Sequence, residues 1–172
     1  VQGLDANWNA VTQIVTLDAS NTTTIVELVT PLIRCFRSLM MSSTAITSTV
    51  RVHNAGETVD YAVIGVGNNQ TLMAIYTVPA GHTAYMSCYY AHVNPATNLD
   101  PTSNPIKLYA RDNAHSTLGI IKHVVGQTSG GFQHFFAPYA KFTEKTDIYI
   151  TATPVGKAAD VSAGFDLILI DD

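Results

Sequence analysis

Apolar and polar residues alternate in short stretches along much of this chain, which is the pattern of β-strands with one face toward a core. Residues 46–53 show it: one set of alternate positions holds Ile46, Ser48, Val50 and Val52, and the other set is polar throughout. The alternation predicts a half-buried strand at this place.

The same pattern, with β-branched and aromatic residues between turn residues, predicts strands from one end of the chain to the other. A short strand is expected before the turn at Asp5-Ala6-Asn7, followed by strands at residues 10–17, 22–28, 46–53, 61–66, 71–78, 83–93, 106–111, 118–125, 132–136, 147–153 and 161–170. Residues 32–41 fit a helical stripe about as well as two strand faces, and the surrounding strands favour a strand. We therefore expect an all-β fold, an antiparallel β-sandwich with jelly-roll-like topology.

The segment NQTLMAIYTVPAGHTAYMSCYY at residues 69–90 is interpreted as two strands joined by Pro79-Ala80-Gly81. Pro79 has no amide hydrogen for a strand ladder, so the first strand should end there. Gly81 tolerates a positive φ and lets the chain reverse. A hairpin with few charges is expected.

The last segment, SAGFDLILIDD at residues 162–172, is apolar on both parities. This composition is typical of a strand that lies centrally in a sheet with both faces covered. A covered strand at the terminus would indicate packing in an oligomer.

Nothing in the chain resembles a Gly/Ser or charged linker, so a single domain over residues 1–172 is the economical expectation, with residues 54–61 as the alternative boundary. Residues 94–105, NPATNLDPTSNP, predict a surface loop or a long crossover connection. The abrupt start at Val1 suggests that residues upstream are missing and that the chain begins inside a larger or processed protein.

Charged residues make up only 13% of the chain, about half of the usual share of roughly 25%, while hydrophobic residues make up 47%. Such a surface is either covered by a partner or is a neutral, Thr-rich β surface. The net charge is −4 and no run of Lys or Arg occurs, so no nucleic-acid partner is expected. No apolar run reaches the ~20 residues of a membrane span, so no membrane partner is expected either.

The motifs of common catalytic and metal sites are missing from the sequence. The six histidines show no metal-binding spacing, and His115, His123 and His134 fall in separate predicted elements. A nucleophile elbow and a phosphate-binding glycine loop are also lacking. We therefore expect no catalytic residue, no metal and no cofactor. Cys35 and Cys88 lie in apolar contexts, which favours free buried thiols over a disulfide.

Carbohydrate binding is the rival to a purely structural role, because aromatic rings beside Asn and Asp can present flat apolar faces to a sugar. The rings in question are Trp8, Tyr85, Tyr89, Tyr90, Phe135, Phe136 and Tyr139. At strand positions such rings are more often part of the core.

Three blocks of sequence carry a family resemblance. They are GLDANWNAVTQIVTL at residues 3–17, NQTLMAIYTVPAGHTAYM at residues 69–86, and EKTDIYITATPV with AGFDLILIDD within residues 144–172. These blocks resemble virion structural proteins of tailed bacteriophages, especially phages of cyanobacteria and other aquatic bacteria. They consist of strands and turns, so the resemblance implies a structural role and transfers no catalytic residue.

The resemblance implies a capsid decoration or cement protein on the surface of the virion. Its partners would be the major capsid protein and further copies of itself, in a homotrimer or another cyclic oligomer. The alternative is a tail or fibre adhesin that recognises host surface polysaccharide. The candidate interaction residues are Asn94, Pro95, Thr97, Asn98 and Asp100 of the long loop, together with Tyr89 and Phe135.

Overall fold

The computed structural model describes all residues except 19, 22, 43, 96–102 and 157, and the described chain is all-β with antiparallel sheets, as expected. It forms two compact units, Val1–Met73 and Ala74–Asp172. The boundary between the two units lies after Met73, and the expectation of a single domain over residues 1–172 stays a prediction. Among the described residues there is no helix that could cross a membrane.

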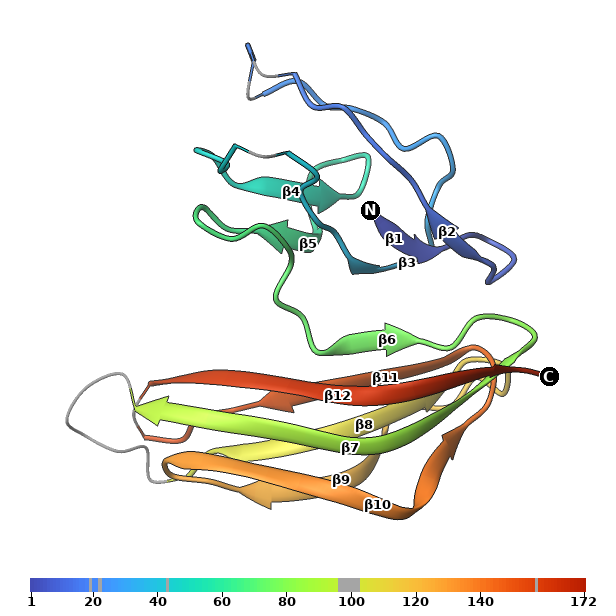
Figure 1. Cartoon of the computed structure of the whole chain (residues 1–172), viewed down its shortest axis with the longest axis vertical. Helices are drawn as coiled ribbons and strands as arrows, with labels where there is room; N and C mark the ends of the chain where they lie inside the picture. The colour runs from blue at the N-terminus through green and yellow to red at the C-terminus, as the bar shows by residue number, and fades with distance from the viewer. Residues whose placement is uncertain (19, 22, 43, 96–102, 157) are drawn as a thin grey trace. The chain divides into compact units, whose positions relative to one another are not determined.

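The first unit contains two small sheets (Figure 1). Strands β1 (Gln2–Leu4), β2 (Ala10–Thr12) and β3 (Arg34–Arg37) form one sheet in the order β2-β1-β3, and β4 (Val50–His53) pairs with β5 (Asp60–Ile64) in the other. Within the segment at residues 32–41, Arg34–Arg37 form a strand, as the neighbouring pattern favoured, and the strand is shorter than the segment. Gly3 is required on β1, because a Cβ there would lie 2.0 Å from the carbonyl oxygen of Arg34 on β3.

Two sheets make up the second unit. Its strands are β6 (Ile75–Thr77), β7 (His82–Pro95), β8 (Pro105–Asp112), β9 (Ile120–Gly126), β10 (Gly130–Phe142), β11 (Thr146–Ala152) and β12 (Ala159–Asp171). They form a four-stranded sheet in the order β6-β11-β8-β9 and a three-stranded sheet in the order β10-β7-β12. Figure 1 shows β12, β7 and β10 passing in front of β11, β8 and β9.

The core of the second unit lies between these two sheets. Val78, Ala84, Met86 and Tyr89 pack with Leu108, Ala110, Phe142 and Ile148, and a second cluster joins Ala91, Val93 and Ile106. Apolar residues from both sheets thus interdigitate, which is the arrangement of a β-sandwich.

The predicted hairpin at residues 69–90 is wrong in its pairing, although the strand does end before Pro79. β6 pairs with β11, while both edges of β7 are occupied by β10 and β12. The Val78 amide donates to the carbonyl of Thr146, which holds the chain against β11 up to the turn. The Pro79-Ala80-Gly81 connection, with Gly81 at φ +71°, therefore leads from one sheet to the other.

The prediction for the last segment is also wrong, because β12 is an edge strand of its sheet rather than a central one. Ile168, Leu169 and Ile170 are 46%, 40% and 50% exposed. β12 has apolar residues at both sets of alternate positions, and burial within the described chain does not explain them.

The expected strand at residues 22–28 is not formed by the described residues 23–28, although these are rich in Thr, Ile and Val. Strand propensity needs a neighbouring strand to bond with, and these residues have no strand ladder. Three further strands, expected at residues 10–17, 46–53 and 71–78, are shorter than predicted. Cys35 and Cys88 are free thiols, as expected.

Candidate functional site

A bulge in β7 decides which of its side chains face outward. Met86 pairs with Leu167 and Cys88 pairs with Asp166, so Ser87 has no partner on β12. An extra residue shifts the alternation of faces by one position. Tyr89 consequently enters the core, and Tyr90 lies 45% exposed on the opposite face.

The outer face of the three-stranded sheet, turned away from the sandwich core, carries polar and aromatic residues beyond this bulge. The register places Tyr90 between Gln133 and Gly164, and it places His92 between Gly131 and Ser162. We call these six residues the Tyr90 face. Every residue of this face comes from β7, β10 or β12, so a continuous strand ladder fixes their positions.

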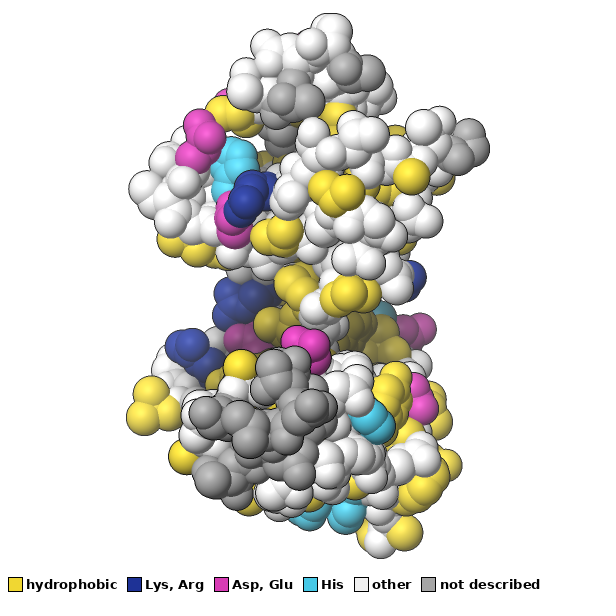
Figure 2. All heavy atoms as spheres, turned by 90° about the vertical axis from the view of Figure 1, so that its left-hand side faces the viewer, with side chains coloured by type: hydrophobic (Ala, Val, Ile, Leu, Met, Phe, Trp, Pro, Cys, Tyr) yellow, Lys and Arg dark blue, Asp and Glu magenta, His cyan; other side chains and the backbone are white. Residues whose placement is uncertain are grey.

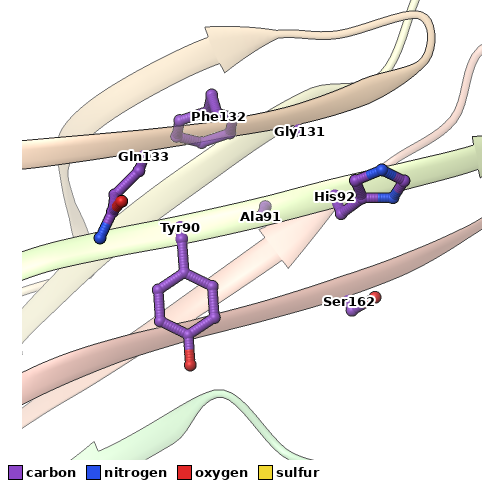
Figure 3. Close-up of a pocket in the computed structure, with 7 residues that line it drawn as sticks. All are labelled: Tyr90, Ala91, His92, Gly131, Phe132, Gln133 and Ser162. Atoms are coloured by element: carbon purple, nitrogen blue, oxygen red, sulfur yellow. The ribbon is translucent and has the colours of Figure 1, made fainter.

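Five residues of the Tyr90 face, all except Gly164, line a shallow hollow with a volume of about 550 Å³, together with Ala91 and Phe132. Figure 3 shows the Tyr90 ring extending from β7 across β12, while the Gln133 side chain reaches from β10 toward β7. This volume lies in the usual range of small-ligand sites, roughly 300–1,000 Å³, but the hollow is open to solvent.

The opposite end of the same sheet is aliphatic. Ile168 and Ile170 lie beside Tyr85 and Thr83 of β7, and Leu169 is exposed at the free edge of β12. We call Ile168, Leu169 and Ile170 the C-terminal strip. More widely, Figure 2 shows hydrophobic side chains reaching the described surface at many points, with charged side chains sparse among them.

The predicted interaction residues fall in different places. Phe135 is 67% exposed on the outer face, in the row next to Tyr90, and Asn94 is exposed near the end of β7. Tyr89, in contrast, is fully buried between the sheets and offers no surface to a partner. Pro95 ends β7, and Thr97, Asn98 and Asp100 lie outside the described residues.

An aromatic cluster that the sequence spacing did not reveal surrounds Tyr89 in the core. The Tyr89 hydroxyl is hydrogen-bonded to Nδ1 of His123, and the rings of His123 and His134 stack with centroids 4.3 Å apart. Burial raises the pKa of Tyr89 to about 12. Burial and, second, the positive charge of His134 lower the pKa of His123. Two histidines expected in unrelated elements are thus neighbours, because the β9–β10 connection passes from one sheet to the other.

Among the described residues, no group of three or more His, Cys, Asp or Glu side chains could hold a metal ion. Around the hollow the structure provides an aromatic ring, an amide, an imidazole and a hydroxyl. No match to this chain is found among models of protein families, curated proteins or solved structures.

Proposed function

We propose that this chain is a non-enzymatic virion structural protein, in particular a capsid decoration or cement protein that stabilises the shell through protein–protein contacts. It acts on the particle surface, where it contacts the major capsid protein and further copies of itself. The resemblance of its three sequence blocks to virion structural proteins of tailed phages supports this role.

The observation that carries the proposal is the C-terminal strip. Edge strands expose unpaired backbone groups, and proteins normally protect them with charges, prolines or bulges. Here three successive aliphatic residues lie on such an edge, each at least 40% exposed. An apolar edge of this kind is suited to be covered by another subunit, through backbone pairing and side-chain burial.

The low charge of the chain points the same way, because only 13% of its residues are charged. A protein that works by burying its surface against neighbours needs little charge on the parts that are covered. In a cyclic oligomer such as a homotrimer, each subunit would cover the edge of the next one, so that every copy of this edge would be covered.

The test is a cryo-electron microscopy map of the intact particle that carries the protein, into which each unit is fitted separately. Density repeating over the icosahedral shell supports the cement role. Density at the tail vertex alone would move the assignment to an adaptor or adhesin, and absence from the particle would overturn both.

Two variants test whether the C-terminal strip is the surface through which the protein contacts the particle. Ile168→Lys combined with Ile170→Lys should reduce occupancy on the particle at least tenfold, because two charges would be buried without partners. Val124→Lys is the matched control, since Val124 is 49% exposed on β9, the edge strand of the other sheet. Equal occupancy of both variants would remove the strip from the proposal.

A further inference from the structure

The Tyr90 face lacks side chains at the two places where rings cover the sheet. A Cβ on Gly164 would lie 2.5 Å from the hydroxyl oxygen of Tyr90 and 2.7 Å from its Cζ. A Cβ on Gly131 would lie 3.0 Å from Cδ2 of His92. The two rings of β7 therefore occupy space that side chains of the neighbouring strands would otherwise fill.

This arrangement places the hydroxyl end of the Tyr90 ring over the backbone of β12 at Gly164. Tyr90 as a whole remains 45% exposed. A ring fixed in this way loses little conformational entropy on binding, which favours it as a contact platform.

Polar groups that are free to bind a ligand surround the ring. Within the described residues, the Tyr90 hydroxyl, the His92 imidazole and the Ser162 hydroxyl have no intramolecular hydrogen bond. The Gln133 amide nitrogen donates to Sγ of Cys88 at 3.6 Å, so its carbonyl oxygen stays available. Donors and acceptors thus border an exposed aromatic ring in one hollow of about 550 Å³.

The charges around the hollow select among ligand classes. Its lining contains no Lys or Arg, and Asp166 lies on the outer face in the next row, so a phosphate or another anion is disfavoured. A wholly apolar ligand would leave the hydroxyl, imidazole and amide groups unpaired. A neutral polyol ring carries no charge and can pair with the polar groups. It offers an apolar C–H face to the tyrosine and hydroxyls to the polar side chains around the hollow.

We propose that the Tyr90 face binds a neutral saccharide, with one sugar ring stacked on Tyr90 and its hydroxyls bonded by Gln133, His92 and Ser162. The site is independent of the assembly role proposed above. Tyr90 and Tyr85, which mark the hollow and the C-terminal strip, are roughly 17 Å apart along β7 at about 3.4 Å per residue. Covering the strip and binding a sugar can therefore occur together.

The experiment screens the whole chain against a printed array of neutral oligosaccharides, namely gluco-, galacto-, manno- and N-acetylglucosamine series, with heparin and hyaluronate as anionic probes. The oligosaccharide that binds is then titrated by calorimetry. Binding to a neutral series, weakened at least tenfold by Tyr90→Ala, is expected. Tyr139→Ala is the matched control, because Tyr139 is an exposed tyrosine on β10 that lies outside the hollow.

A second variant tests the site even if Tyr90→Ala does not fold. Ser162→Arg fills the hollow from an exposed position and leaves the ring in place, and it should also weaken binding at least tenfold. Circular dichroism confirms that each variant is folded. The proposal is overturned if no neutral probe binds at millimolar concentration, if the anionic probes bind instead, or if folded Ser162→Arg binds as the unmodified chain does.

Discussion

The hydroxyl of Tyr89 on β7 is hydrogen-bonded to Nδ1 of His123 on β9, and this part-buried bond joins the two sheets of the second unit. The Tyr89 ring also contacts Phe132 edge to face, with centroids 5.3 Å apart, and His134 at 5.8 Å. One side chain thus combines apolar burial with a polar link between sheets.

Removing only the phenol oxygen separates these two contributions. Tyr89→Phe keeps the ring contacts and loses the bond to His123, so we expect the free energy of unfolding to fall by about 1 kcal/mol. Tyr89→Ala removes the ring as well and should cost about 3–5 kcal/mol. Urea unfolding measures both values. Tyr139→Phe at an exposed position should change stability by less than about 0.5 kcal/mol, and an equal loss there would contradict the assignment.

The stability of the second unit should fall on acidification through the titration of His123. Its pKa is lowered in the folded chain by burial and then by the charge of His134, whereas an unfolded histidine titrates near pH ~6.5. The unfolded state therefore binds more protons just below that pH. The stability that depends on neutral His123 is complete above about pH 6.5. It is lost as the pH falls from there through the lower pKa that His123 has in the folded chain.

Thermal midpoints between pH 7.5 and pH 5 test this expectation. His134→Phe keeps a ring beside His123 and removes its charge, so the loss of stability on acidification should become smaller. His53→Asn changes a histidine of the other unit and should leave the pH dependence unchanged. If the His134→Phe variant keeps the full pH dependence of the thermal midpoint, the interaction of His123 with His134 does not control that dependence.

Residue patterns predicted most strands of the second unit because alternation and turn residues are local properties. β8, β9, β11 and β12 lie within one or two residues of the expected ranges at every end. Pairing is not local: both β6 and β7 were expected, but their membership in different sheets depends on which strands occupy their edges. The same limit explains β12, whose apolar composition does not distinguish a central strand from an uncovered edge.

The candidate site was predictable only in part, for a comparable reason. Tyr89 and Tyr90 are the same residue type at neighbouring positions, and the bulge at Ser87 alone decides which of the two rings is buried. Strict alternation from Ala84 onward would put Tyr90 on the same face as Ala84 and Met86, but the bulge shifts it to the opposite face. Asn94 and Phe135 do lie exposed on the sheet, while the pairing of His123 with His134 required the fold itself.

A buried polar pair ties β6 to β11. The Thr77 hydroxyl donates to Oδ1 of Asp147 at 2.7 Å, and Asn113 donates to the other carboxylate oxygen at 2.9 Å. Thr77→Val keeps the volume and removes one hydrogen bond to a charged group, so it should destabilise the chain by about 1.5–3 kcal/mol in urea unfolding. Thr153→Val, at an exposed position, is the control and should cost less than about 0.5 kcal/mol. Equal effects of the two changes would show that the buried pair contributes nothing specific.

The two units should differ in their ability to fold alone, because the core is distributed unevenly between them. Both hydrophobic clusters lie wholly within Ala74–Asp172, whereas among the described residues of Val1–Met73 the buried hydrophobic ones are Leu4, Ala62 and Ile64. A chain that buries so little apolar surface does not offset its loss of conformational entropy.

Expressing each unit separately tests this asymmetry. The fragment of residues 74–172 should show a strand-type circular dichroism spectrum and a cooperative thermal transition, whereas the fragment of residues 1–73 should lack such a transition. In the whole chain, limited proteolysis should cleave the first unit before the second. A folded first fragment beside an unfolded second one would reverse the assignment, and failure of both to fold would mean that the units stabilise each other.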